Sequence, residues 1–178
     1  MNLRMTPHPH HSTPVAAPPA NCFTVLIIDD LAANRLLLRK FLESAGYAVI
    51  EATNGVEALD LLRARQIQPD LVVTDIEMPV MDGITLVEQI RVLDSGVATV
   101  PIVTASGNAD EEMRKQSLAA GSDIFLTKPF DLKQLRREIG GLLRSRRKVS
   151  RANFNVTSMP EPLSRLDTEA GAEAGQQG

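Results

Sequence analysis

Short apolar runs alternate with segments of helical periodicity along the central part of the chain. The apolar runs are typical of buried parallel strands, and they cover Thr24–Ile28, Tyr47–Glu51, Leu71–Asp75, Val97–Thr104 and Ile124–Thr127. Between and after them, apolar spacing predicts helices over Ala33–Leu42, Gly55–Arg65, Ile84–Leu93, Asp110–Ala120 and Leu132–Leu143. This alternation predicts an α/β fold with a right-handed, doubly wound, five-stranded parallel sheet and helices on both faces.

The segments on either side of this alternation lack a periodic pattern. Residues 1–21 are rich in Pro, His, Ala and Thr, so we expect a disordered N-terminal tail. We expect one folded domain at residues 22–146 and a flexible C-terminal tail at 147–178. A basic run near the last helix is either a docking patch for an acidic partner or nucleic acid, or a solvated helix end that complements the helix dipole, which we favour. It contains Arg144, Arg146, Arg147, Lys148 and Arg151.

Composition narrows the classes of function. The chain has 178 residues, a formal net charge of -3, no Trp and one Tyr, so we expect no nucleic-acid partner. No apolar run approaches the ~20 residues that span a bilayer, and no apolar segment of a secretory signal follows Arg4. The single Cys22 forms no intrachain disulfide, and we expect a cytoplasmic protein. His8, His10 and His11 lie in the N-terminal tail, where we expect no specific metal site.

Polar residues occur where four of the predicted strands end. Asp29 and Asp30 follow the first strand, Asp75 ends the third, Thr104 ends the fourth and Lys128 follows the fifth. The carboxyl ends of parallel strands meet at one edge, where ligands bind in open α/β sheets. Each residue alone has an ordinary interpretation, such as a helix cap for the acidic pair or a solvated lysine. Their joint placement favours a functional site.

The residue types at this edge suit phosphoryl transfer. Clustered carboxylates repel one another and favour a bound cation, and their oxygens suit Mg²⁺ better than zinc, since no His or Cys lies at this edge. Asp75 would accept the phosphoryl group as an aspartyl phosphate, while Lys128 and Thr104 would stabilise the transferring oxygens. Because an acyl phosphate is labile, the product suits a transient signal.

With these residues, the chain from Thr24 to Leu143 resembles the receiver domain of bacterial two-component response regulators. The resemblance is carried by the acidic pair after the first strand, by Asp75 followed by MPVMDG, by Thr104, and by the sequence Lys128-Pro129-Phe130. It implies a flavodoxin-like sheet with strand order 2-1-3-4-5.

The resemblance also implies how the site binds its cofactor. Asp75 would be the phosphoacceptor, and Mg²⁺ would be held by Asp30 directly and by Asp29 through water. Asp75 and the backbone carbonyl of Glu77 would be the remaining protein ligands of the ion.

A second set of implied roles concerns the switch. Lys128 would contact the phosphoryl group, and Thr104 would turn inward to hydrogen-bond it. Phe125 would be the aromatic switch residue that follows Thr104; its ordinary interpretation is an apolar strand residue. The Lys128-Pro129 bond would be cis.

We interpret the chain as a phosphorylation-operated switch or phosphorelay intermediate that catalyses only its own phosphorylation and dephosphorylation. A sensor histidine kinase or His-phosphotransfer protein would donate phosphate from phosphohistidine. A downstream protein would contact the face formed by the fourth helix, fifth strand and last helix. We expect no DNA-binding output domain in the chain.

Three other functions match the sequence less well. The main alternative is a phosphohydrolase with an aspartyl-phosphate intermediate, because Glu77 lies two residues after the nucleophile, where such enzymes carry an acid/base carboxylate. Its usual type, however, has the nucleophile after the first strand and a cap insertion. A nucleotide-binding module is disfavoured because no Gly-rich loop follows the first strand. A receiver that acts by binding alone is disfavoured by the complete acidic and Lys set.

Overall fold

The computed structural model describes residues 22–157 except Ser95 and Ala109, and beyond Arg146 it describes the backbone alone. Five strands form one sheet in the order β2-β1-β3-β4-β5, and every neighbouring pair is parallel. The predicted fold class and strand order are therefore confirmed. The strands are β1 (Thr24–Ile28), β2 (Ala48–Ala52), β3 (Leu71–Asp75), β4 (Ile102–Ser106) and β5 (Ile124–Thr127).

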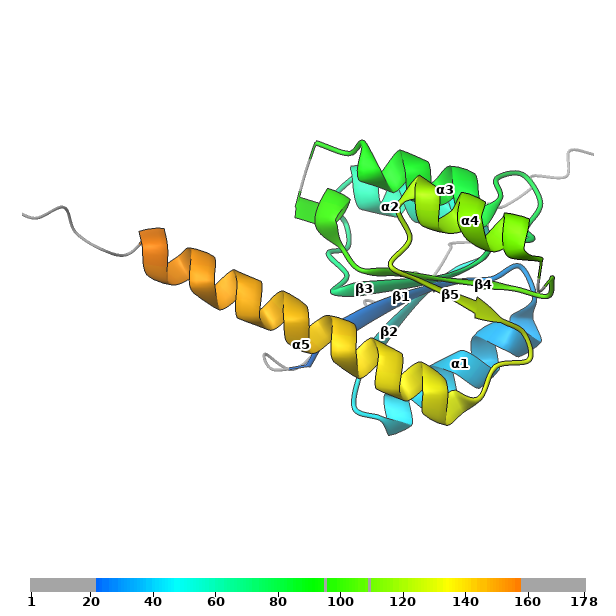
Figure 1. The fold of residues 1–178 in the computed structure, drawn as a ribbon, viewed down its shortest axis with the longest axis horizontal. Coiled ribbons are helices and arrows are strands. Elements are labelled where there is room, and N and C mark those ends of the chain that lie inside the picture. The colour runs from blue at the N-terminus through cyan, green and yellow to red at the C-terminus, as the bar shows by residue number, and fades with distance from the viewer. Residues whose placement is uncertain (1–21, 95, 109, 158–178) are drawn as a thin grey trace, which may run out of the picture.

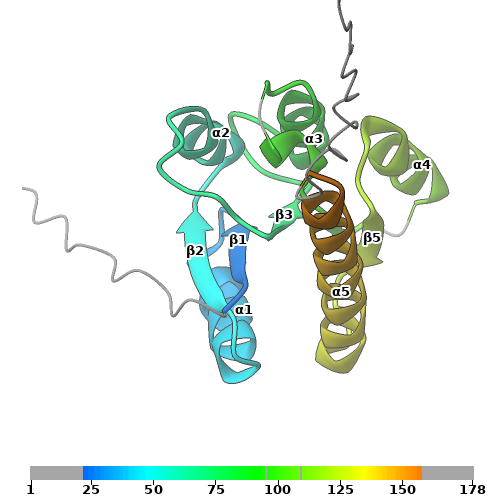
Figure 2. The ribbon, with the colours of Figure 1, turned by 90° about the vertical axis from the view of Figure 1, so that its left-hand side faces the viewer.

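Helices cover both faces of the sheet. Figures 1 and 2 show α2, α3 and α4 on one face and α1 and α5 on the other. The helices are α1 (Ala32–Ser44), α2 (Gly55–Arg63), α3 (Gly83–Arg91), α4 (Glu111–Ala120) and α5 (Leu132–Thr157). In the described part of the chain, none of them combines the length and apolar character needed to span a membrane.

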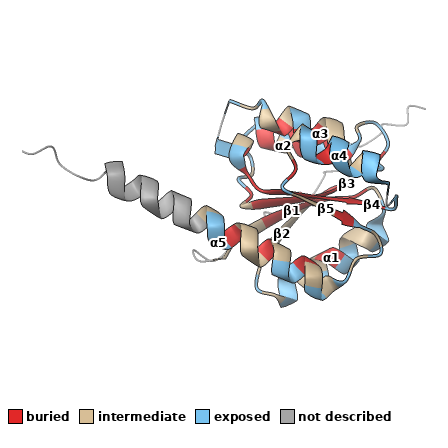
Figure 3. Cartoon of the chain, in the orientation of Figure 1, coloured by how far each residue is buried: buried red, intermediate tan, exposed pale blue. Residues whose placement is uncertain are grey.

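Side chains that alternate in direction along each strand divide the hydrophobic core into two layers, one on each face of the sheet. In β1, Leu26 and Ile28 belong to the cluster under α2 and α3, whereas Val25 and Ile27 belong to the cluster with α1 and α5. Successive side chains of a strand point to opposite faces, so a sheet that is covered on both faces needs continuous apolar strands. Figure 3 shows the central strands buried throughout.

The buried face of α1 differs from the predicted one. The pattern indicated Leu36, Leu37, Phe41 and Leu42. Leu42 is buried and Phe41 packs against the core, as predicted, but Leu36 and Leu37 are about half exposed and Leu38 is buried instead. Several consecutive leucines satisfy more than one helical stripe, so periodicity alone does not select the face. The exposed leucines lie on the outer surface of the molecule.

The fourth strand begins later than predicted. A short 3₁₀ helix, η1 (Gly96–Thr99), takes the place of its first residues, and β4 begins at Ile102 and continues past Thr104 to Ser106. Arg91, at the end of α3, donates hydrogen bonds to the carbonyls of Ala98 (3.0 Å) and Val100 (2.7 Å). Arg91 thus satisfies one carbonyl of η1 and one carbonyl just after it, which supplies partners that the sheet would otherwise provide.

The last helix is longer than predicted. It extends to Thr157 rather than ending at Leu143, and Figure 1 shows it projecting beyond the sheet. Among the described side chains, which end at Arg146, Leu143 is the last buried one in α5, so a buried apolar stripe no longer predicts the helix after that point. Arg and Lys are good helix formers and favour its continuation. Residues 147–157 of the tail expected at 147–178 thus belong to α5. The tail expected at 1–21 and the remainder at 158–178 lie outside the described residues, so they and the domain limits stay predictions.

A capping box begins α2. The Asn54 side chain accepts a hydrogen bond from the Glu57 amide (2.9 Å), and the Glu57 carboxylate accepts from both the hydroxyl (2.6 Å) and the amide (2.7 Å) of Thr53. The hydrogen bonds from Thr53 lower the pKa of Glu57. The ionised carboxylate therefore stabilises the fold above the unfolded-state pKa, and this contribution is lost as pH falls through the folded-state pKa.

The pH dependence of stability in a Glu57 variant should test the role of this cap. We expect Glu57→Gln to lower the free energy of unfolding at neutral pH by about 0.5 kcal/mol, a small value because the side chain is exposed and screened. In urea titrations, the difference from the unsubstituted protein should shrink as the pH is lowered through the folded-state pKa. Glu88→Gln, on the exposed face of α3, is the control. A difference independent of pH would contradict the role of the carboxylate.

Candidate functional site

The ammonium group of Lys128 joins the ends of three strands. Its Nζ lies 2.6 Å from Asp75 Oδ2 and 3.0 Å from Asp29 Oδ2. Asp75 is the last residue of β3, Asp29 follows β1, and Lys128 follows β5. The parallel sheet thus brings together side chains that are distant in sequence, as the pattern of strand ends predicted.

Both carboxylates that Lys128 contacts are buried. Asp29 is 2% exposed and Asp75 is 7% exposed. Burial raises the pKa of Asp75 above its usual value, because desolvation outweighs the hydrogen bond from Lys128. Burial alone would lower the pKa of Lys128, but its hydrogen bonds to Asp75 and Asp29 raise it, so the ammonium stays charged.

A third carboxylate completes an oxygen cluster suited to a cation. Asp29, Asp30 and Asp75 each place a carboxylate oxygen within 4.8 Å of the others. Asp30 is the most accessible of the three, so the cluster opens to solvent on its side. Carboxylate oxygens are the donors that Mg²⁺ prefers, and the described residues offer no His or Cys in this cluster. The donor set fits Mg²⁺, whereas the carbonyl of Glu77 as a ligand stays a prediction.

The first turn of α1 holds the acidic pair in place. Asn34 Nδ2 donates to both oxygens of Asp29 (3.0 and 3.2 Å), and Arg35 donates to the carbonyls of Asp29 (2.7 Å) and Asp30 (3.1 Å). Arg35 is in turn bonded to Glu51 (3.4 Å). Sequence reasoning missed these two residues, although a polar pair directly after the acidic residues was a usable signal.

The hydroxyl of Thr104 points toward α4. It shares a hydrogen bond of 2.7 Å with the Ser117 hydroxyl, which is 2.8 Å from the Ser122 hydroxyl, and it donates to the Ile124 carbonyl (3.2 Å). All three hydroxyl residues are buried. The expected contact between Thr104 and a group on Asp75 therefore requires this bond to break. Nothing in the sequence marked Ser117 or Ser122 as partners of Thr104.

Phe125 and Glu77 lie close to these groups. Phe125 is directly opposite Thr104 in the register of β4 and β5 and is half-buried. Glu77 donates its amide to Asp75 Oδ1 (3.3 Å), and its carboxylate accepts a hydrogen bond from the Gly107 amide (2.9 Å). Glu77 thus links the loops that follow β3 and β4.

The loop after β3 folds tightly against the phosphoacceptor candidate. The Gly83 amide donates to the Ile76 carbonyl (2.9 Å), and a Cβ at Gly83 would lie 2.2 Å from the Asp75 carbonyl oxygen. Glycine is therefore required at position 83 by the close approach of two backbone segments.

The peptide bond that follows Lys128 has the expected geometry. The Lys128-Pro129 peptide bond is cis, which confirms that prediction. The Lys128 amide donates to the Ser106 carbonyl (2.7 Å), so the backbone is anchored to the end of β4.

Comparison with known proteins agrees with this geometry. The response regulator receiver domain model matches residues 25–140, and the chain belongs to this family. Over 112 residues it is 36% identical to sporulation initiation phosphotransferase F of Bacillus subtilis, which covers 63% of this chain and 86% of that protein. Over 106 residues it is 40% identical to chemotaxis protein CheY of Halobacterium salinarum, which covers 60% of this chain and 84% of that protein.

A solved relative carries a metal at its site. The receiver domain of sensor histidine kinase PA1611 from Pseudomonas aeruginosa, with a magnesium ion coordinated in its active site cleft, superimposes with a TM-score of 0.63 and 27% identity. The match covers 68% of this chain and 98% of that structure.

Other matched relatives are longer than this chain. The chain spans 13% of sensor histidine kinase CheAY of Helicobacter pylori and 52% of transcriptional regulatory protein ResD of Bacillus subtilis.

Adding a methyl group at Gly83 should distort the site. We expect Gly83→Ala to lower the free energy of unfolding by about 1–3 kcal/mol, because backbone atoms must move to relieve the overlap. Urea titration measures this loss. Gly141→Ala is the matched control, since a Cβ there meets nothing within 4 Å. Equal stability of Gly83→Ala and the unsubstituted protein would contradict the close approach.

Proposed function

We propose that the chain is a two-component receiver that accepts phosphate from a phosphohistidine donor onto Asp75. The observation that carries the proposal is the contact of Lys128 with Asp75 and Asp29 at the carboxyl edge of the sheet. A nucleophilic carboxylate, a fixed ammonium and a cluster of oxygen donors are the groups that in-line phosphoryl transfer needs.

The reaction uses this chain's own groups as follows. Asp75 attacks the phosphorus of phosphohistidine, the new O–P bond forms as the N–P bond breaks, and the electron pair returns to the imidazole nitrogen, which takes up a proton. The product is an aspartyl phosphate. Lys128, already beside the attacking carboxylate, neutralises charge on the transferring oxygens and positions them.

The acidic cluster is the proposed Mg²⁺ site. Asp29, Asp30, Asp75 and the Glu77 carbonyl would hold the ion, which supplies charge neutralisation for the carboxylates and the incoming phosphoryl oxygens. Asn34 and Arg35 keep Asp29 and Asp30 oriented toward the cluster, so their hydrogen bonds reduce the reorganisation needed when the cation binds.

Phosphorylation is proposed to act through Thr104. A phosphoryl group on Asp75 offers the Thr104 hydroxyl a charged acceptor, which is a stronger partner than the Ser117 hydroxyl. When Thr104 turns, Phe125 beside it changes rotamer, and the face of α4, β5 and α5 shifts in population. A downstream protein would recognise that face.

The surface for the phosphodonor is proposed to lie beside the acidic cluster on α1. A cavity of about 480 Å³ there is lined by apolar residues together with Asp29 and Lys128. Leu37, on its rim, is 56% exposed, and Leu31 near Asp29 is 57% exposed. Exposed leucines next to a charged reaction centre suit the apolar side of a helix that carries phosphohistidine.

Removing the acceptor carboxylate should abolish labelling. We expect Asp75→Asn to incorporate no hydroxylamine-labile phosphate from a labelled phosphohistidine protein with Mg²⁺ present, because an amide does not form the acyl phosphate. The measurement is retained radiolabel after transfer. Asp82→Asn, which keeps an N-cap for α3, is the control that should label normally.

Normal labelling of Asp75→Asn would refute the acceptor assignment. Steady hydrolysis of a small phosphate ester by the unsubstituted protein would instead favour the phosphohydrolase alternative.

A change at the α1 surface should separate docking from chemistry. We expect Leu37→Asp to slow phosphorylation by a phosphohistidine protein at least tenfold while leaving phosphorylation by acetyl phosphate unchanged, because the small donor needs no docking surface. Initial rates of phosphorylation measure both. Val92→Asp is the control, since Val92 is 75% exposed at the end of α3. A similar loss with both donors would place Leu37 in the fold rather than in docking.

A further inference from the structure

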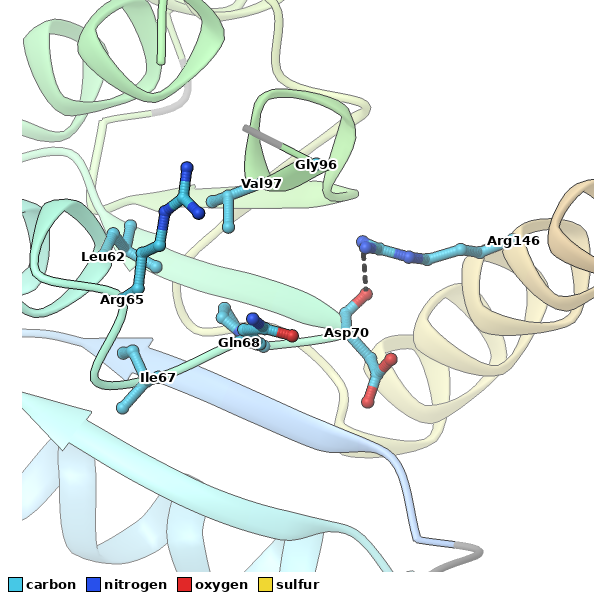
Figure 4. A pocket seen from close by; sticks show the side chains of 9 residues that line it. Leu62, Arg65, Ile67, Gln68, Asp70, Gly96, Val97 and Arg146 are labelled. Atoms are coloured by element: carbon cyan, nitrogen blue, oxygen red, sulfur yellow. Dashed lines mark hydrogen bonds between the residues drawn. The ribbon is translucent and has the colours of Figure 1, made fainter. Parts of the chain in front are cut away.

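A second cavity lies at the opposite edge of the sheet from Asp75. It holds about 290 Å³ and lies beside Asp70, which precedes β3, so the length of that strand separates it from the acidic cluster. Its apolar lining includes Leu62, Ile67 and Val97, and its polar lining includes two arginines (Figure 4). The proposed phosphorylation chemistry uses none of these residues.

Arg65 lines this cavity, and its backbone adopts a conformation that suits glycine better. Arg65 follows α2 with a φ of +53°, and its amide donates to the Leu62 carbonyl (3.1 Å) while the Gln66 amide donates to the Leu61 carbonyl (3.1 Å). These bonds close the helix in a left-handed turn where glycine is the usual residue. Among the described residues, the Arg65 guanidinium has no hydrogen bond or ion pair, so no internal contact explains an arginine here.

Arg146 enters the cavity from the other side. Figure 4 shows it extending from α5 toward Asp70, where it donates a long hydrogen bond of 3.3 Å to the backbone carbonyl. Among the described residues, Arg146 forms no ion pair with the Asp70 carboxylate, which points away from it in Figure 4 and accepts a hydrogen bond from the Thr24 amide (2.8 Å). The structure thus gives Arg146 an internal contact, whereas the sequence favoured a solvated helix end for the basic run that contains it.

We infer that this cavity binds a small organic anion whose carboxylate or phosphate lies between Arg65 and Arg146. Guanidinium groups pair with oxyanions through charge-assisted hydrogen bonds, and here Arg65 and Arg146 line the cavity from opposite sides, with Gln68 also in its lining. The apolar floor of Leu62, Ile67 and Val97 would contact the hydrocarbon part of the ligand.

The size and position of the cavity define the ligand further. Its volume is at the low end for ligand sites, which suits a compact acid or phosphate monoester. Arg65 follows α2 on one face of the sheet, and Arg146 belongs to α5 on the other. An anion held by both would tie these layers together, and α5 is part of the proposed output face.

The test uses phenyl phosphate and benzoate as anionic probes and phenol as the uncharged control, with the full chain and no Mg²⁺. Titration followed by amide NMR should show saturable shifts around Gln68 and Gly96 with both anions and none with phenol. We expect Arg146→Gln to raise the dissociation constant at least tenfold, as loss of a charge-assisted hydrogen bond predicts.

A variant at Arg65 separates binding from folding. We expect Arg65→Gly to raise the urea midpoint, because glycine adopts the left-handed turn without strain, and yet to weaken anion binding at least tenfold. Arg63→Gln is the matched control; Arg63 lies at the end of α2, bonds to Gln89 and does not line the cavity.

Three results would overturn the inference. One is unchanged binding of phenyl phosphate by Arg65→Gly and Arg146→Gln. Another is an equal response to phenol. The third is binding of an acidic peptide with no binding of either small anion, which would assign the cavity to a protein partner.

Discussion

The contact of the Lys128 ammonium with two buried carboxylates is the interaction on which the site depends. Asp29 and Asp75 follow neighbouring strands and are almost inaccessible to solvent, so without a cation they would repel one another at short range. Even with Lys128 in place, burial keeps the pKa of Asp75 raised. The ionised form of Asp75 is therefore less favourable in the folded protein than in the unfolded chain, and its ionisation lowers the free energy of unfolding. A bound cation would relieve this unfavourable charge arrangement.

Much of the fold followed from strand patterning, because strands covered on both faces leave unambiguous apolar runs. Asp75 ends β3 as expected, and the acidic pair and Lys128 meet at one edge, since parallel topology forces the strand ends together. The fourth strand was misjudged because Val97 is apolar and buried yet belongs to η1, where Arg91 satisfies the backbone. Apolar character reports burial and does not report which backbone conformation achieves it.

Other features depend on contacts that no local pattern encodes. Ser117 and Ser122 are small polar residues whose role arises because α4 packs its hydroxyls against Thr104. The exposed face of α1 was ambiguous because adjacent leucines fit two stripes, and only packing selected Leu38 and Leu42. The end of α5 was missed for another reason, since the helix continues past Leu143, the last buried residue among its described side chains. For α1 and α4, tertiary structure decided between options that the sequence left equal.

The chain of three buried hydroxyls would set the resting arrangement of the proposed switch. If Thr104 turns toward Asp75, Ser117 keeps a partner in Ser122, while the Ile124 carbonyl gives up the bond from the threonine. Ser122 thus limits the number of polar groups that lose a partner, and a modest bias at Asp75 would then be enough to shift the population. A lone serine beside Thr104 would lose its hydroxyl partner in the same step.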